Sequence, residues 1–164
     1  MILQREKLNF IKNPKSQPEL ENYKDLIEKQ LRPKARNDII KYLSEHNVIP
    51  NSMIDVSDGI SSDLVHISQS SNLGFKVFED KLPISKEVKK ISKELNIDYI
   101  SSALNGGEEY EILFSLSPED FNKIDKKVSD ISPIGFFTNN KDKTIVCRDG
   151  REDELKSYGW KHFK

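Results

Sequence analysis

Cysteine and histidine are scarce in this chain of 164 residues, which has one cysteine and three histidines. The single cysteine, Cys147, excludes a disulfide within the chain. A zinc site needs several Cys or His ligands at short spacings, and three scattered histidines do not supply such a set. We therefore expect any bound metal ion to be held by oxygen ligands.

Long apolar runs and a strong excess of either charge are also missing. No apolar run approaches the ~18 residues that a membrane-spanning helix requires. The opening residues, MILQREKLNF, carry charges where a signal peptide has its apolar region. The formal net charge of −1 gives no electrostatic reason to expect nucleic acid as a partner. The sequence predicts a cytoplasmic protein that binds neither membranes nor nucleic acid.

The common signatures of phosphate-binding loops and nucleophilic catalysis do not occur either. Neither GxxxxGK[ST] nor GxGxxG is present, so any phosphate chemistry is not of the P-loop or Rossmann kind. No Ser/His/Asp or Cys/His set with a supporting motif is visible.

What the chain does have is apolar periodicity that alternates between helical and strand spacing. This alternation favours an α/β (α+β) fold, in which helices pack on a mixed sheet with some likeness to a ferredoxin-type arrangement. Residues 1–34, with three prolines, are expected to form a connector and a first helix, packed as one compact unit with the domain of residues 35–164. The expected helices are residues 18–31, 35–47, 57–74, 85–97 and 117–128, and the expected strands are 48–57, 74–80, 109–116, 131–138 and 143–150.

The stretch DVSDG, residues 55–59, lies where a strand pattern changes into a helix that Gly74 is expected to end. Ser57 or Asp58 could simply cap this helix, since both residue types are preferred there. Alternatively, Asp55 and Asp58 could bind Mg²⁺, which takes carboxylate oxygens and keeps positions for water and phosphate. Backbone N–H groups at the same helix end favour a phosphate. A metal-bridged nucleotide phosphate would satisfy both groups.

A second stretch, SALNGGEEYEILF, places Gly106 and Gly107 directly before a group of acids and a strong strand pattern. Taken alone, it would be a turn with solvated carboxylates. However, Glu108, Glu109 and Glu111 at the start of a buried strand are costly unless at least one has a cationic or metal-bound partner.

The third stretch is the carboxyl-terminal SYGWKHFK, which holds the only tryptophan, Trp160, beside His162 and Phe163. Short tails are often frayed. Large aromatic side chains in such a tail indicate that it docks, either on the core of the chain or on a flat ligand.

In this order, the three stretches resemble the carboxyl-terminal half of the thiamine-monophosphate kinase family, in the superfamily built like aminoimidazole ribonucleotide synthetase. The family patterns D-[IV]-S-D-G, G-G-E-D-Y-E-L and G-[WYF]-[DN]-H-F correspond to residues 55–59, 106–112 and 159–163. Glu109 and Lys161 depart from the patterns. The resemblance spans essentially the whole chain.

The resemblance implies a Mg²⁺-dependent kinase that transfers the γ-phosphoryl group of ATP directly to thiamine monophosphate, giving thiamine diphosphate. It implies Asp55 and Asp58 as Mg²⁺ ligands, with Asp58 at the catalytic centre, and Ser57 as a contact to ATP. Glu108 and Trp160 would contact thiamine monophosphate.

Family members also carry an amino-terminal half that supplies further metal-binding acids and the dimer interface. The resemblance therefore implies that this domain is missing from the chain and that the full-length protein forms a homodimer. We expect the chain alone to have little or no kinase activity.

Two other interpretations remain open at this stage. A sibling enzyme of the same superfamily, such as a selenophosphate synthetase or a hydrogenase-maturation protein, would share the architecture and the use of ATP. A non-catalytic module would use its acids only to cap helices and would pack its tail on the core.

Overall fold

The computed structural model describes residues 2–17, 20–107, 110–125 and 130–155. The chain divides into two compact units, Met1–Lys34 and Ala35–Lys164. In the first unit, α1 (Ile2–Lys12) is followed by a 3₁₀ turn (Glu21–Tyr23) and α2 (Lys24–Leu31). The sequence predicted only a connector where α1 lies. Helix formers dominate that segment and the prolines begin only at Pro14, so nothing local interrupts a helix there.

The second unit contains a four-stranded sheet in the order β4-β2-β5-β6. The central strands β2 (Gly74–Phe78) and β5 (Lys143–Val146) are parallel. The edge strands β4 (Gly135–Thr138) and β6 (Glu152–Glu154) run antiparallel to their neighbours. The expected mixed sheet with packed helices is therefore confirmed. Although β4 and β5 follow one another in the chain, both pair with β2 and they do not form a hairpin.

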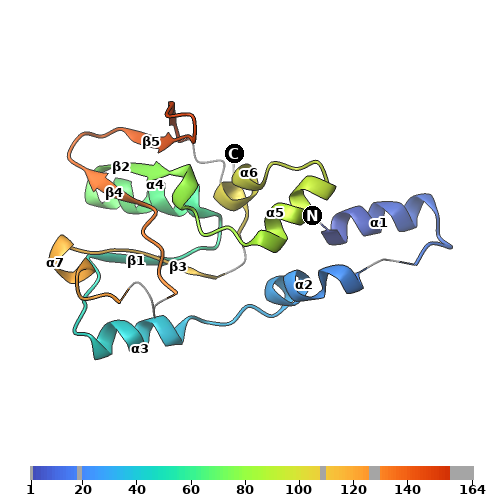
Figure 1. The fold of residues 1–164 in the computed structure, drawn as a ribbon, viewed down its shortest axis with the longest axis horizontal. Coiled ribbons are helices and arrows are strands. Elements are labelled where there is room, and N and C mark those ends of the chain that lie inside the picture. Colours follow the sequence, from blue (N-terminus) through green and yellow to red (C-terminus); the bar gives the residue numbers. More distant parts are fainter. Residues whose placement is uncertain (1, 18–19, 108–109, 126–129, 156–164) are drawn as a thin grey trace. The chain divides into compact units, whose positions relative to one another are not determined.

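A separate two-stranded ribbon joins β1 (Ser52–Asp55) and β3 (Ile112–Ser115) in antiparallel register. Leu113 packs on a core cluster built around Leu64, Phe75 and Val77, whereas the next residue, Phe114, packs on the α3 side chains. The alternation of side chains along a strand thus places one core on each face of the ribbon. Figure 1 shows the ribbon between α3 (Asn37–Glu45) and α4 (Ile60–Ser71).

Three helices of this unit end in the same way, with an asparagine in the left-handed conformation. These residues are Asn47 after α3, Asn72 after α4 and Asn96 after α5 (Lys86–Glu94), with φ of 52°, 53° and 52°. After α4, the N–H of Leu73 donates to the carbonyl of Ser68 at 3.1 Å, as in a Schellman motif. The expectation that Gly74 ends α4 is therefore wrong, because Asn72 does so and Gly74 already belongs to β2.

Two other expected elements differ from the structure, and one helix was not expected. The strand expected over residues 109–116 is limited to β3, and Tyr110 has a φ of 53°, which is incompatible with a strand. The helix expected over residues 117–128 is limited to α7 (Pro118–Phe121), which Ser117 caps. The sequence did not predict α6 (Tyr99–Asn105), which is seven residues long. No helix in the described ranges is long and apolar enough to cross a membrane.

Truncation of Phe75 tests the larger core. This side chain is 1% exposed, so we expect Phe75→Ala to lower the free energy of unfolding by about 3–5 kcal/mol. The matched control is Phe136→Ala, because Phe136 lies on the neighbouring strand and is 53% exposed. Urea unfolding followed by circular dichroism gives both values, and similar losses in the two variants would contradict this description of the core.

Candidate active site

The DVSDG stretch forms the turn between β1 and α4. The backbone pairing of β1 with β3 continues for one more residue on each strand, because the Val56 N–H donates to the Glu111 carbonyl at 2.7 Å. The Val56 carbonyl accepts from the Tyr110 N–H at 3.3 Å. Gly59, with a φ of 102°, is the N-cap residue of α4, and no side chain caps this helix. The interpretation that Ser57 or Asp58 caps the helix is therefore wrong.

The carboxylates of Asp55 and Asp58 are exposed at this turn. Neither takes part in a hydrogen bond or ion pair with another residue of the described ranges. An exposed carboxylate without a protein partner keeps its oxygens available for a ligand. The turn thus presents two available carboxylates a few residues apart.

The two glycine-containing stretches meet backbone to backbone. A Cβ atom added at Gly107 would lie 1.8 Å from the Ser57 carbonyl oxygen. A Cβ atom at Gly59 would lie 2.7 Å from the Leu104 carbonyl oxygen. Only glycine permits such close approach. The structure therefore brings the 106–107 turn directly against the 55–59 turn, although about fifty residues separate them in the chain.

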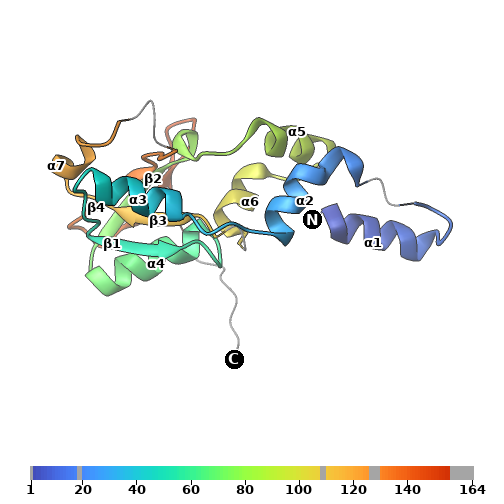
Figure 2. The ribbon, with the colours of Figure 1, turned by 90° about the horizontal axis from the view of Figure 1, so that it is seen from below.

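Helices α4 and α6 also hold these turns together through a buried serine. Ser61 is 1% exposed, and its hydroxyl group lies 2.8 Å from the Leu104 carbonyl and 3.0 Å from Asn105 Oδ1. Figure 2 shows α4 running alongside β1, with α6 near its first turn. Sequence reasoning missed Ser61 because it also missed α6. The available signal was Asp98, whose side chain caps α6 by accepting from the Ile100 and Ser101 N–H groups.

Asp63 is a buried carboxylate behind the DVSDG turn, and the sequence analysis did not single it out. It lies in the first turn of α4 and is 2% exposed. Burial is the main cause that raises the pKa of Asp63, while a hydrogen bond from the Ser57 backbone acts in the opposite direction. The signal in the sequence was an aspartate directly before the core residue Leu64.

Glu111 has a cationic partner. The sequence analysis expected such a partner, or a metal ion, for at least one of Glu108, Glu109 and Glu111. Arg36 Nη1 lies 2.5 Å from a Glu111 carboxylate oxygen, and Arg36 also pairs with Asp38 at 2.9 Å and Asp130 at 3.0 Å. The Arg36 side chain is only 17% exposed. Hydrogen bonds to Asp38 and Glu111 raise the pKa of Arg36, so it remains cationic at any pH at which the protein is folded.

Three positions predicted from the sequence cannot be placed. Glu108, Glu109 and Trp160 lie outside the described residues. Asp55, Ser57 and Asp58 are the predicted site residues that the structure brings together at one turn. Within the described ranges, no group of three or more histidine, cysteine, aspartate or glutamate residues is arranged to hold a metal ion.

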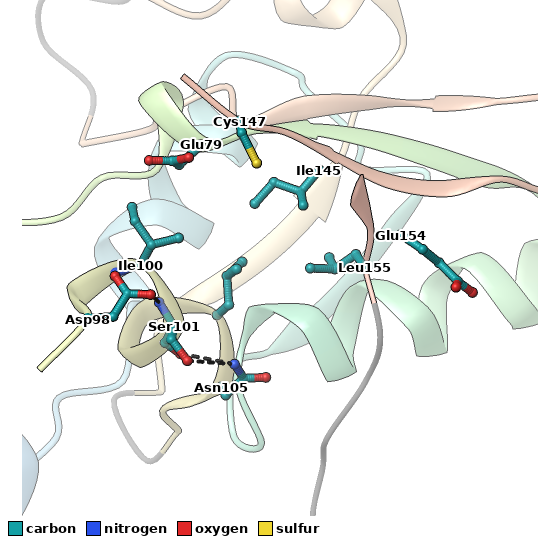
Figure 3. A pocket seen from close by; sticks show the side chains of 10 residues that line it. Glu79, Asp98, Ile100, Ser101, Asn105, Ile145, Cys147, Glu154 and Leu155 are labelled. Carbon is teal, nitrogen blue, oxygen red and sulfur yellow. Dashed lines mark hydrogen bonds between the residues drawn. The ribbon is translucent and has the colours of Figure 1, made fainter. Parts of the chain in front are cut away.

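A cavity of about 410 Å³ lies between α6 and the strands β5 and β6 (Figure 3). Its acids Glu79 and Asp98 have protein partners, because Glu79 pairs with Arg148 at 3.2 Å and Asp98 caps α6, and the third acid, Glu154, is not without a partner either. Burial raises the pKa of the Cys147 thiol at the same cavity, which makes it a weak nucleophile at neutral pH. Asp55, Ser57 and Asp58 do not line this cavity, although Leu104 and Asn105, which contact Ser61, do.

Known proteins are similar to the chain in both sequence and fold. Thiamine-monophosphate kinase from Aquifex aeolicus is 35% identical over 138 residues, covering 84% of this chain and 41% of that protein. The enzyme of the same name from Buchnera aphidicola of Schizaphis graminum is 34% identical over 163 residues, covering 96% of this chain and 47% of that protein. The chain corresponds to the carboxyl-terminal part of the thiamine-monophosphate kinases. It spans less than half the length of these relatives.

Solved structures agree with this assignment. AaThiL complexed with AMPPCP and TMP superposes with a TM-score of 0.70 at 30% identity, covering 96% of this chain and 46% of that chain. The hydrogenase-maturation protein HypE from E. coli has a TM-score of 0.58 at 16% identity, which shows a shared fold alone. The expected architecture of the aminoimidazole ribonucleotide synthetase type is therefore confirmed. No protein-family model matches the chain.

Replacement of Arg36 tests its place in the site. We expect Arg36→Met to lower the free energy of unfolding by about 1–3 kcal/mol, because charge-assisted hydrogen bonds to three carboxylates are lost. Lys41→Met is the matched control, since Lys41 is 77% exposed and, among the described residues, forms an ion pair only with Glu45 at 3.7 Å. That control should change stability by at most about 0.5 kcal/mol. Equal effects in chemical denaturation would show that the Arg36 network is an ordinary surface ion pair.

Proposed function

We propose that the chain is the carboxyl-terminal part of an enzyme that transfers the γ-phosphoryl group of ATP to thiamine monophosphate. The observation that carries this proposal is the pair of available carboxylates, Asp55 and Asp58, on a turn packed against Gly107. Relatives at 34–35% identity are thiamine-monophosphate kinases, and the related AaThiL was solved with AMPPCP and TMP. The likeness to HypE concerns the fold alone, so the sibling activity has less support.

The donor set at the turn fits Mg²⁺. This ion is usually bound through one or two carboxylates, with water and substrate phosphates completing its octahedral shell. Asp55 and Asp58 would provide the carboxylates, because both are exposed at the turn. When bound, the ion would neutralise charge that develops on the transferring phosphoryl group.

The chemistry needs positioning more than covalent catalysis. A phosphate oxygen of thiamine monophosphate attacks the γ-phosphorus in line, the bond from that phosphorus to the β–γ bridging oxygen breaks, and ADP leaves. Ser57 would orient the nucleotide at the DVSDG turn, while Glu108 and Trp160 would hold thiamine monophosphate. The product is thiamine diphosphate, and the transfer forms no phosphoenzyme.

On this proposal, kinase activity requires a protein as long as the relatives, because the amino-terminal half would supply further metal ligands. We expect the chain alone to form thiamine diphosphate at least about 100-fold more slowly than a full-length relative, because part of the positioning machinery is absent. A coupled assay of ADP release with product detection measures this. Comparable turnover by the isolated chain would show that the second half of these enzymes is catalytically self-sufficient.

Asp58→Asn tests the role of the DVSDG turn in the longest native product that contains this chain. We expect kcat to fall by at least about 100-fold with little change in thermal stability, because an interaction at the transferring phosphate is lost mainly in the transition state. Asp80→Asn is the control, since Asp80 is an exposed aspartate whose one ion pair within the described part of the chain is with Lys81 at 3.5 Å. Full activity in the Asp58 variant would support a non-catalytic module instead.

A further inference from the structure

Asp63 is a buried carboxylate that the proposed transfer does not use. Its side chain is 2% exposed, and Oδ2 is buried without a hydrogen-bond partner among the residues that the structure describes. A buried carboxylate oxygen that lacks a partner costs free energy, and such groups are rare in folded proteins. The position of Asp63 at the first turn of α4 therefore calls for a compensating group.

The surroundings of Asp63 carry an excess of negative charge. Besides burial, the nearby charges of Asp58 and Asp55 raise its pKa, whereas the Ser57 backbone and the exposed His66 lower it. Three carboxylates thus interact at the DVSDG turn, and two of them, those of Asp55 and Asp58, are exposed. All three carboxylates would attract a cation bound at the two exposed ones. The buried carboxylate contributes to this attraction because a charge shielded from water acts more strongly than a solvated one.

Asp63 itself is poorly placed to be a ligand. Mg²⁺ gives up its water reluctantly and keeps several water molecules in most protein sites. A side chain that is 2% exposed cannot reach such a hydrated ion unless the turn opens. Any action of Asp63 on the ion must therefore pass through the turn, by its charge and by the backbone of Ser57.

We propose that Asp63 is a positioning residue for a divalent cation at Asp55 and Asp58. The Asp63 carboxylate attracts the ion and helps to hold it in place from behind the turn, without contacting the ion. This inference rests on the proposed function, because it takes Asp55 and Asp58 as the cation site. It assigns Asp63 a role that the packing of α4 alone does not require, since a neutral side chain of similar size would fill the same space.

The test compares the wild-type chain with Asp63→Asn, by thermal unfolding and titration calorimetry with MgCl₂. Asparagine has nearly the same size as aspartate, so the variant should be folded and at least as stable without Mg²⁺. We expect the Mg²⁺ concentration at half-saturation to rise about tenfold or more. Asp63→Ser, a second neutral variant, should show the same direction of change.

Asp98→Asn is the matched control. Asp98 lies at the start of α6, and asparagine caps a helix as well as aspartate does. This variant should leave the half-saturating Mg²⁺ concentration unchanged. Circular dichroism without Mg²⁺ checks that all variants are folded.

An unchanged half-saturation in Asp63→Asn would overturn the inference, and so would a wild-type chain that shows no Mg²⁺-dependent shift. Loss of the fold in both neutral variants would also overturn it, because Asp63 would then be needed for folding itself. A tenfold weaker Mg²⁺ response together with no thiamine diphosphate from the full-length protein would support the inference and refute the proposed kinase function.

Discussion

The approach of Gly107 to the Ser57 carbonyl is the constraint on which the candidate site depends. Any side chain at position 107 would collide with Ser57, so the two turns can meet only because glycine stands there. Their contact fixes where the exposed aspartates lie relative to Gly107 and the end of α6. The hydrogen bond between the Val56 N–H and the Glu111 carbonyl then extends the ribbon up to this contact.

Arg36 stabilises the same region from the other side of the ribbon. Its guanidinium binds Glu111, the residue directly before β3. Its other partners, Asp38 and Asp130, come from segments almost a hundred residues apart. A planar guanidinium can serve several carboxylates at once, which lysine cannot do with the same geometry. The two glycine contacts and this arginine network therefore act on one short stretch, residues 55–59 and the strand paired with it.

Local features of the site could be predicted from the sequence. The change of apolar period at DVSDG predicted a strand-to-helix transition at residue 57, and in the structure β1 ends at Asp55 and α4 begins at Ile60. A cationic partner for at least one glutamate of the second stretch was also predicted, and Glu111 has such a partner. The identity of that cation was not predictable, because Arg36 lies 75 residues away in the chain. The strand order β4-β2-β5-β6 and the burial of Asp63 depend on tertiary packing in the same way.

The distribution of ion pairs gives the site its chemical character. The chain has 26 basic and 27 acidic residues, so cations are not in short supply. Lys76, Lys123 and Arg148 each pair with an acid elsewhere in the described ranges, while Asp55 and Asp58 have no such partner. Placing like charges together costs stability, and proteins commonly bear this cost where function requires it. On the proposal that Asp55 and Asp58 hold a divalent cation, the bound ion would remove the repulsion among Asp55, Asp58 and the buried Asp63, and the turn would be most stable with the ion bound.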